Sequence, residues 1–382
     1  MTDNATPLVV LATGGTGGHV FPAEALAGEL AARGHRLALV TDRRGGQFSG
    51  LLGDLETHRI RAGGVAGKRF AALLHSGSEL AIGLFQARSL LKRLRPQAVV
   101  GFGGYASVPT MLAAGFGGFA TAIHEQNAVV GRANRMLAPR VRRIATCFDR
   151  VSGIPDGAQA KVQRTGMPVR PTVISCREIP YPELSDTSPI HLMIVGGSQG
   201  ARVLSDIVPA AIGGLPAAMR ERIRVIQQCR PEDVERVREA YAKVGTEAEL
   251  NTFFADLPAR IAAAHLIIGR AGASTVAELT TIGRPAILVP YPFAADDHQA
   301  GNAHAIDEAG GGWLMAEAAF TADALAKRLE SLFGLPAVLQ RTAANARAAG
   351  RPDAAVALAD LIAGIISNGA NGGGARDGRK AA

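Results

Sequence analysis

The stretch LVVLATGGTGGHVFPAEALAGELAARG, residues 8–34, joins a short apolar run, a glycine-rich turn and a helical pattern. The run at 8–12 predicts a buried strand, and residues 21–33 predict a helix. The turn GGTGGH at 14–19 places four glycines, a threonine and His19 between them. Glycines at the carboxyl end of a strand let backbone N–H groups and a helix N-terminus approach an anion. The stretch therefore predicts a ligand-binding turn, and the alternative is a tight structural turn.

The turn matches neither of two common nucleotide-binding motifs. The dinucleotide motif G-x-G-x-x-G, read from Gly15, requires glycine at position 20, which is Val20. The phosphate-binding loop requires Lys and then Ser or Thr where His19 and Val20 stand. An NAD-dependent dehydrogenase is suggested by Asp42, at the end of the second predicted strand, where an acid that binds ribose often lies. The missing third glycine argues against it.

Short apolar runs alternate with helical patterns along the rest of the chain. Strands are predicted at 36–41, 98–102, 121–125, 143–148, 190–195, 224–229, 251–255, 265–268 and 286–290. Helices are predicted at 76–95 and from about 201, whereas 151–189 reads as irregular and 368–382 as a disordered tail. The strand at 190–195 leads into GGSQG at 196–200, a second glycine turn before a helix. Two such series predict an α/β protein of two Rossmann-like domains with parallel sheets that face a cleft.

Composition places the chain among globular proteins with a large core. It has 382 residues, of which 47% are hydrophobic, and a mean hydropathy of +0.14. Cys147, Cys176 and Cys229 have no paired or metal-ligand spacing, which suits a reducing compartment. No signal peptide is evident, and no apolar run approaches the roughly 18–20 residues of a membrane span. We expect a protein of the cytosol or of the cytosolic face of a membrane.

The net charge of +8 is unevenly distributed. Residues 1–150 hold 18 Lys and Arg against 9 Asp and Glu, whereas the remainder holds 23 against 24. This basic excess fits an anionic membrane, or a non-catalytic module that binds a polyanion. Nucleic acid is not expected as the partner, because aromatic residues make up only 5% and no helix-turn-helix, zinc-finger or ribonucleoprotein signature is present.

Three further segments carry chemistry. GRAGASTVAEL at 269–279 predicts a glycine turn and a helix with Ser274 or Thr275 near its cap. Glu278 would then lie in the first turn, where its carboxylate could accept ribose hydroxyls, and the alternative is a capping box of Thr275 and Glu278. HEQN at 124–127 places His124 at a strand end, where a structural histidine is more common than a catalyst. DDHQAGNA at 296–303 reads as a polar contact loop rather than a metal site, because the chain has no Asp-x-Asp.

Seven motifs in this order resemble one family, the bacterial peptidoglycan glycosyltransferases that convert lipid I into lipid II by transfer of N-acetylglucosamine. The motifs are GGTGGHVFPAEALA, GFGGYASVP (101–109), HEQNAVVGRAN (124–134), GMPVR (166–170), GGSQGAR (196–202), GRAGASTVAEL and DDHQAGNA. The resemblance spans about residues 8–365. Thr13 departs from the Gly or Ala expected there, and His298 stands where some members carry Gln.

The resemblance implies the GT-B architecture. Residues 1–170 would form the acceptor domain, which binds lipid I and docks on the membrane, and residues 171–346 would form the donor domain for UDP-N-acetylglucosamine. Residues 347–367 would form a C-terminal helix that returns to the first domain. The nearest alternative within this architecture is a UDP-N-acetylglucosamine 2-epimerase. The family works in peptidoglycan synthesis at the cytoplasmic face of the cell membrane, where other cell-wall synthesis proteins are possible partners.

The resemblance also implies site residues. Thr16, Gly17 and Gly18 would lie near the diphosphate and sugar of the donor, with Asn127 and Gln299 on the sugar. Arg170 and Ser198 would lie near the uridine or the phosphates, the backbone around Phe254 would contact uracil, and Glu278 would bind the ribose hydroxyls. Ala273, Ser274 and Thr275 complete the expected substrate-binding set.

The family inverts the anomeric carbon, so the 4-hydroxyl of the acceptor attacks opposite the departing UDP. A hydroxyl requires a base at or before attack, and His19, with an ordinary pKa of about 6.5, is the expected one. Glu125 is the second expected catalytic residue, and His124 remains open as a base. Backbone N–H groups at the helix after GGSQG, with Arg170, would stabilise the departing UDP. No cofactor and no metal are expected.

The basic excess of the first domain predicts docking on an anionic membrane surface. Residues 68–95 carry Lys68, Arg69, Arg88, Lys92, Arg93 and Arg95 against one acid, Glu79. Apolar residues at helical spacing lie among them, namely Leu80, Leu84, Phe85 and Leu91. Residues 132–143 add five arginines and no acid. The alternative is an amphipathic helix whose apolar face packs into its own domain.

Overall fold

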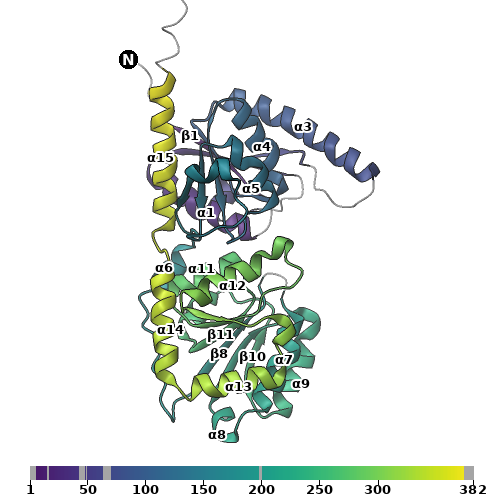
Figure 1. Ribbon diagram of the computed structural model, residues 1–382, viewed down its shortest axis with the longest axis vertical. Coiled ribbons are helices and arrows are strands. Elements are labelled where there is room, and N and C mark those ends of the chain that lie inside the picture. The colour runs from purple at the N-terminus through teal and green to yellow at the C-terminus, as the bar shows by residue number, and fades with distance from the viewer. Residues whose placement is uncertain are drawn as a thin grey trace, which may run out of the picture. The chain divides into compact units, whose positions relative to one another are not determined.

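The structure is a computed structural model that describes residues 6–14, 17–42, 48, 50–62, 70–197 and 200–373. The side chains of residues 17, 70–76 and 368–373 lie outside this description. The chain divides into two units (Figure 1). Unit 1 takes Met1–Arg170 together with Asp353–Ala382, and unit 2 takes Pro171–Pro352. None of the described helices is both long enough and apolar enough to cross a membrane.

Unit 1 is built on a parallel sheet of seven strands in the described residues, in the order β3-β2-β1-β4-β5-β6-β7. The strands are β1 (Leu8–Ala12), β2 (Arg36–Asp42), β3 (Glu56–Ile60), β4 (Ala98–Gly101), β5 (Ala120–Glu125), β6 (Arg143–Thr146) and β7 (Val162–Arg164). The helices are α1 (Gly17–Ala32), α2 (Leu51–Asp54), α3 (Phe70–Leu94), α4 (Gly104–Phe116), α5 (Arg132–Leu137), η1 (Ala138–Arg140), η2 (Asp156–Lys161) and α15 (Ala354–Gly373).

Alternate residues of β1 face the two sides of this sheet, as the two-residue period of a strand requires. Val10 and Ala12 pack with α3, α4 and α5 on one side. Val9 and Leu11 pack with α1 and α15 on the other. Both faces are thus covered, which explains why the central strands read as unbroken apolar runs.

Unit 2 repeats the arrangement with six described strands in the order β10-β9-β8-β11-β12-β13. They are β8 (Ile190–Val195), β9 (Ile223–Gln228), β10 (Glu247–Asn251), β11 (Leu266–Gly269), β12 (Ala286–Leu288) and β13 (Gly312–Leu314). The helices are α6 (Pro171–Cys176), α7 (Arg202–Gly213), α8 (Ala217–Arg220), η3 (Pro231–Asp233), α9 (Val234–Lys243), α10 (Leu257–Ala263), α11 (Ala273–Ile282), η4 (Ala295–Asp297), α12 (His298–Glu308), η5 (Glu317–Ala319), α13 (Ala322–Phe333) and α14 (Pro336–Ala349). One face of β8 packs with α7, α9 and α13 in a single core.

The predicted parallel α/β sheets are present, but several element boundaries differ. The strand predicted at 251–255 is β10, Glu247–Asn251, because the apolar pair that suggested it belongs to the loop after the strand, where Phe253 is 72% exposed. The stretch 151–189, predicted to be irregular, contains β7 and α6. Strands β3, β7 and β13 have no counterpart in the prediction. They lie at or next to a sheet edge, and β3 and β7 carry polar residues.

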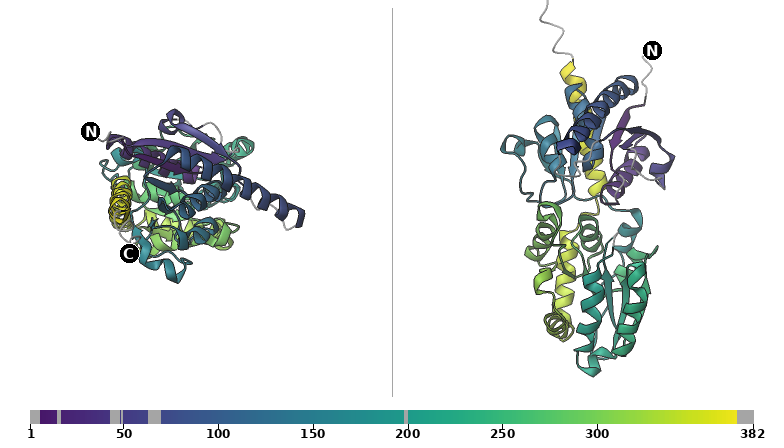
Figure 2. Two further views of the ribbon diagram at one scale, coloured as in Figure 1. Left: turned by 90° about the horizontal axis from the view of Figure 1, so that it is seen from above. Right: turned by 90° about the vertical axis from the view of Figure 1, so that its right-hand side faces the viewer.

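The carboxyl-terminal helices also differ from the predicted span of 347–367. α14 ends at Ala349, and a separate helix, α15, runs over Ala354–Gly373 against α1 and β5 of unit 1 (Figure 2). α15 thus continues past 368, where the tail was expected to begin, and residues 374–382 lie outside the described residues.

Candidate active site

In unit 1, the direction of chain progression reverses between β1 and β4. Successive strands run outward from β1 through β2 to β3, and from β4 through β5 to β7 on the other side. The connections that leave the carboxyl ends of β1 and β4 therefore diverge, and ligands of open parallel sheets bind at such switch points. The predicted glycine turn follows β1, and the segment Phe102–Gly104 follows β4.

His19 lies in the first turn of α1, directly beside this second segment. A Cβ atom at Gly103 would lie 3.3 Å from Cε1 of His19, and one at Gly104 would lie 3.4 Å from Cδ2. Both glycines have positive φ, 87° and 72°. Any side chain at either position would strain the backbone and press on the imidazole. The two glycines thus leave the space that the ring of His19 occupies, a role that the sequence interpretation did not foresee.

Glu125, at the end of β5, is 1% exposed and serves as a hub for the loop that follows it. Its Oε1 accepts from the backbone N–H of Asn127 at 3.0 Å and from its side-chain amide at 3.4 Å. Its Oε2 accepts from the N–H of Gly131 at 3.0 Å and from Nδ2 of Asn134 at 2.8 Å. Nδ2 of Asn134 also lies 3.6 Å from the Cβ position of Gly103. Glu125 therefore holds Asn127 and Asn134 directly, and Asn134 and His19 both lie beside Gly103.

His124, the residue before Glu125, is fully buried, and its hydrogen bonds define its tautomer. Nε2 of Gln126 donates to Nδ1 at 3.2 Å, so Nε2–H of His124 donates to the carbonyl of Gly166 at 3.0 Å. Burial lowers the pKa of His124 to about 4, the hydrogen bond to Gly166 opposes this shift, and the nearby His19 adds to it. A neutral ring with both nitrogens bonded matches the structural interpretation of this histidine.

Unit 2 has its own switch point between β8 and β11. The glycine turn after β8 begins with Gly196 and Gly197, and Gly197 has a φ of 80°. A Cβ atom at Gly196 would collide with the backbone of Gly200 and Ala201, so the turn folds back tightly on itself. Two expected site residues, Thr16 in unit 1 and Ser198 here, lie outside the described residues.

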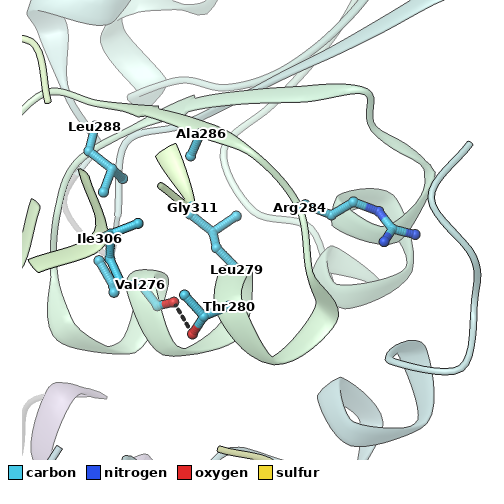
Figure 3. Close-up of a pocket in the computed structure, with 8 residues that line it drawn as sticks. All are labelled: Val276, Leu279, Thr280, Arg284, Ala286, Leu288, Ile306 and Gly311. Carbon is cyan, nitrogen blue, oxygen red and sulfur yellow. Dashed lines mark hydrogen bonds between the residues drawn. The ribbon is translucent and has the colours of Figure 1, made fainter. Parts of the chain in front are cut away.

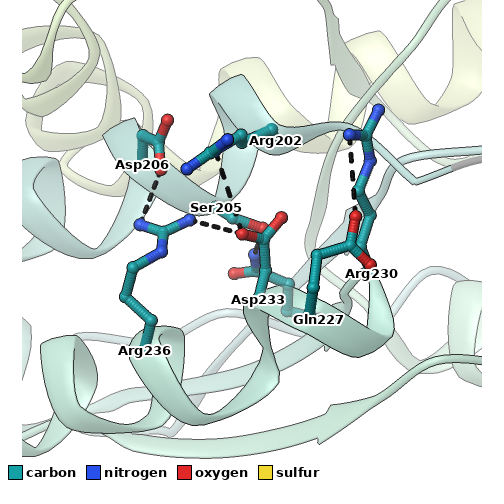
Figure 4. Close-up of polar contacts among 8 residues, drawn as sticks. Arg202, Ser205, Asp206, Gln227, Arg230, Asp233 and Arg236 are labelled. Carbon is teal, nitrogen blue, oxygen red and sulfur yellow. Dashed lines mark hydrogen bonds and ion pairs between the residues drawn. The ribbon is translucent and has the colours of Figure 1, made fainter.

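A polar cluster supports the start of α7, where this turn ends (Figure 4). Asp233 is buried, and its Oδ1 accepts from Arg236 at 2.8 Å and lies 4.0 Å from Nε of Arg202. Arg236 also pairs with Asp206 of α7 at 2.6 Å. The cluster therefore clamps the first two turns of α7 to α9.

The amino end of α11 faces the same switch point without a side-chain cap. Its N-cap is Gly272, and the helix opens with Ala273, Ser274 and Thr275. Oγ of Ser274 is buried and has no hydrogen-bond partner among the described residues. Backbone N–H groups at a helix N-terminus together with an unpartnered hydroxyl form a site suited to an anion or a hydroxyl-bearing ligand.

The structure corrects two expectations about Glu278. Because α11 begins at Ala273, Glu278 is the sixth helical residue and lies in the second turn, not the first. The capping box of Thr275 and Glu278 is also wrong, because the N-cap is Gly272, whose extended backbone ends the preceding turn. Glu278 is 8% exposed.

The body of α11 is held by packing against β12 and α12, and its carboxyl end is held by the buried guanidinium of Arg284 (Figure 3). Val276 and Leu279 face Leu288 of β12 and Ile306 of α12. Arg284 is 2% exposed and donates to five backbone carbonyls, those of Ile179, Pro180, Ala262, Ile282 and Gly283. Burial lowers its pKa to about 10, so it stays charged at neutral pH.

The loop between β12 and α12 is also fixed by polar contacts. Asn302, fully buried, donates to the carbonyl of Ala271 at 3.0 Å and ties α12 to the turn before α11. Oε1 of Gln299 accepts from the N–H of Tyr291 at 3.0 Å. Arg270 donates to the carbonyls of Val289 and Pro290 at 3.2 and 3.1 Å. Within the described residues, no group of His, Cys, Asp and Glu has the arrangement of a metal site.

The remaining expected residues lie as follows. Gly17 and Gly18 open α1, and apart from its chain neighbours and the backbone of α1 no described atom lies within 4 Å of the Cβ position of Gly18. The guanidinium of Arg170 lies 5.1 Å from the ring centroid of Phe21 in unit 1. Phe254 is 6% exposed under the guanidinium of Arg260 at 4.5 Å. Sequence reasoning missed Arg270, Arg284 and Asn302 because each acts through a contact between distant segments.

Two Rossmann-like units, each with a glycine turn at its switch point, are the architecture of the GT-B fold. The chain belongs to glycosyltransferase family 28: the N-terminal domain of that family matches residues 9–146, and its C-terminal domain matches residues 191–358. This confirms the resemblance drawn from the seven motifs.

Individual relatives and solved structures are similar to this chain over nearly its full length. A protein of Paramagnetospirillum magneticum named UDP-N-acetylglucosamine–N-acetylmuramyl-(pentapeptide) pyrophosphoryl-undecaprenol N-acetylglucosamine transferase is 61% identical over 95% of this chain and 98% of its own. The crystal structure of MurG from Acinetobacter baumannii is 29% identical, with a TM-score of 0.77 over 94% of this chain and 99% of that one. A UDP-N-acetylglucosamine 2-epimerase structure from Listeria monocytogenes has a TM-score of 0.63 over 96% of this chain and 98% of that one, but at 13% identity it shows the shared fold alone.

Proposed function

We propose that this enzyme transfers N-acetylglucosamine from UDP-N-acetylglucosamine to the 4-hydroxyl of the N-acetylmuramoyl group of lipid I, which yields lipid II and UDP. The observation that carries the proposal is the near full-length identity to a transferase named for these substrates. The two switch points place the groups that the reaction requires: His19 at the one in unit 1, and the uncapped N-terminus of α11 at the one in unit 2. The 2-epimerase alternative has only the fold in its favour.

In this proposal, unit 2 holds the donor. The uncapped N-terminus of α11 and the unpartnered hydroxyl of Ser274 would bind the nucleotide near its phosphates and ribose, with Glu278 on the ribose hydroxyls. Gln299 has its oxygen occupied by the N–H of Tyr291, so its NH₂ group remains to donate to a sugar oxygen. Phe254 provides the backbone that contacts uracil.

Unit 1 would hold lipid I and the base. As the 4-hydroxyl oxygen bonds to the anomeric carbon, the bond to the phosphate oxygen breaks and UDP departs with the electron pair. His19 takes the hydroxyl proton. Arg170 and helix N-termini offset the charge that UDP gains. The carboxylate of Glu125 already accepts four hydrogen bonds. We therefore assign Glu125 a positioning role: it orients Asn127 and, through Asn134, supports the segment at Gly103 beside which His19 lies.

We also propose that unit 1 docks on the cytoplasmic face of the membrane through α3. Leu80, Leu84 and Leu91 pack into the core of unit 1, as the alternative interpretation requires. Phe85, however, is 77% exposed. Arg88, Lys92, Arg93 and Arg95 are exposed on the same helix or directly after it, whereas Lys68 and Arg69 lie outside the described residues. Figures 1 and 2 show the amino-terminal part of α3 extending beyond the rest of unit 1.

Unit 1 also exposes a second basic and apolar cluster, at the end of α4 and in the segment 136–143. Phe116, at the end of α4, is 64% exposed, with the guanidinium of Arg140 at 6.0 Å from its ring centroid. Met136 is 41% exposed, and Arg142 and Arg143 are exposed nearby in the chain. Aromatic rings and arginines in this combination suit the interface of an anionic bilayer.

The test is incubation of the full-length enzyme with labelled UDP-N-acetylglucosamine and lipid I. We expect label in the lipid fraction and release of UDP. Consumption of UDP-N-acetylglucosamine without lipid labelling, with formation of the 2-epimer, would support the alternative.

The variant Glu278→Gln tests the proposed contact between the Glu278 carboxylate and the ribose hydroxyls of the donor. We expect weaker donor binding, by about 1.5–3 kcal/mol for one charge-assisted hydrogen bond, with kcat retained. A melting curve recorded beside the titration separates lost binding from lost stability. Unaltered UDP affinity in calorimetric titration would remove Glu278 from the site.

A further inference from the structure

An aromatic pair stands exposed in the loop that follows β12. Phe293 is 82% exposed and Tyr291 is 43% exposed. Their rings meet edge to face, with centroids 5.7 Å apart and an interplanar angle of 68°. A phenylalanine exposed to this extent gains little from burial in the fold itself.

The pair is held in place by its surroundings. The guanidinium of Arg270 lies 5.4 Å from the ring centroid of Tyr291 and pairs with Glu317 at 2.5 Å. Pro290 and Pro292 flank Tyr291 and restrict the backbone on both sides. The loop that carries Phe293 is therefore held in place through Tyr291, while the ring of Phe293 itself is exposed to solvent.

The position of the loop points to a ligand. It leaves the carboxyl end of β12, the edge where open parallel sheets bind their ligands. The N–H of Tyr291 also fixes Gln299, the residue that we place on the donor sugar.

We propose that Phe293 is a stacking platform for the apolar face of a pyranose ring in one of the two sugar substrates. This inference rests on the proposed function. A pyranose presents C–H groups on one face, and these carry partial positive charge that the electron-rich face of an aromatic ring attracts. The ring comes either from the N-acetylglucosaminyl group of the donor or from the N-acetylmuramoyl group of the acceptor.

The experiment compares full-length Phe293→Leu and Phe293→Trp with the wild type. Leucine keeps an apolar side chain but lacks the aromatic face, whereas tryptophan keeps that face. KM is measured for UDP-N-acetylglucosamine and, separately, for a soluble short-chain lipid I analogue. UDP affinity is measured by calorimetry. Leu335→Ala is the control, because Leu335 is 54% exposed between α13 and α14, outside the site.

For Phe293→Leu we expect KM for one sugar substrate to rise about 3- to 10-fold, the size of an aromatic contact. UDP affinity and melting temperature should remain at wild-type values, and Phe293→Trp should restore KM. A raised donor KM assigns the ring to the donor, and a raised acceptor KM assigns it to the acceptor.

Unchanged KM values for both substrates in an active Phe293→Leu enzyme would overturn the inference and leave the function intact. A loss of UDP affinity would also overturn it, because UDP contains no pyranose. A wild-type enzyme that transfers no sugar would overturn both.

Discussion

The ring of His19 lies against two glycines that are far away in the sequence. Gly103 and Gly104 follow β4, and they meet α1 only because β4 lies next to β1 in the sheet. Neighbouring strands that are distant in the chain cannot be read from local patterns. The glycine turn and His19 were therefore predictable from sequence, whereas the contact that seats the imidazole was not.

The substitution His19→Ala should lower kcat about 10²–10⁴-fold, the range for loss of a general base, with little change in donor KM. A melting curve recorded beside the kinetics separates lost chemistry from lost stability. Gly103→Ala should lower kcat in the same direction, because its methyl group would displace the ring. A His19→Ala enzyme with near wild-type kcat and a raised KM would make His19 a binding residue instead.

His124 makes the folded protein sensitive to acid. Its pKa is about 4 when folded and about 6.5 when unfolded, so between these pH values the unfolded state binds more protons. The free energy of unfolding is therefore unaffected by His124 above pH 6.5. It decreases as the pH falls toward 4, by about 3 kcal/mol in total, because protonation of His124 favours the unfolded state. Urea unfolding at several pH values should show this slope in the wild type and a shallower slope in His124→Gln. Equal slopes would assign the acid sensitivity to other groups.

Among the elements, α11 combines a binding end with an anchored end. Its amino end is uncapped, whereas Arg284 holds its carboxyl end and that of α10 by donating to their last carbonyls. Carbonyls at a helix C-terminus carry partial negative charge, which a buried guanidinium satisfies. No motif in the sequence marked Arg284, because a single arginine between a helix and a strand looks like a surface residue until the chain is folded.

Replacement of Arg284 by methionine should lower the free energy of unfolding by about 2–4 kcal/mol, because five carbonyls would lose this donor, three of them in buried hydrogen bonds. Arg284→Lys should lose less, since lysine keeps the charge and up to three donors. Urea denaturation measures both. The control is Arg341→Met on α14, an exposed position where we expect a change within about 0.5 kcal/mol. A fully stable Arg284→Met protein would contradict this account.

The sequence predicted the central strands well and the edge strands poorly. β1 is buried along its whole length and β8 at every residue but His191, and both read as apolar runs. β10 alternates between exposed and half-buried residues, and its register depends on β9 rather than on its own composition. Short strands such as β7 form only because a partner is already in place.

At the scale of the whole molecule, the basic excess of the first 150 residues predicts a measurable affinity for membranes. The full-length protein should sediment with anionic vesicles and not with neutral ones, and salt should reverse this. Substitution of Arg88, Lys92, Arg93 and Arg95 with Gln should abolish sedimentation, since each contributes about 1 kcal/mol, while activity on a short-chain soluble acceptor persists.

The control for this experiment changes four exposed basic residues of unit 2 to Gln, namely Arg238, Lys243, Lys327 and Arg328. This control should sediment like the wild type. If the α3 variant still sediments fully at low salt, the docking face lies elsewhere.

The placement of α15 has a consequence for how the protein is made. Leu358, Ile362 and Ile365 complete the core that covers Val9 and Leu11, so one face of the unit 1 sheet is closed by α15, the last of the described helices. A ribosome that has finished residues 1–170 must still synthesise all of unit 2 before that helix emerges. Unit 2 is continuous in sequence and contains its whole core. The order of completion during translation is therefore reversed: the unit synthesised second finishes folding first, and the nascent first unit keeps part of an apolar face open until α15 has been synthesised.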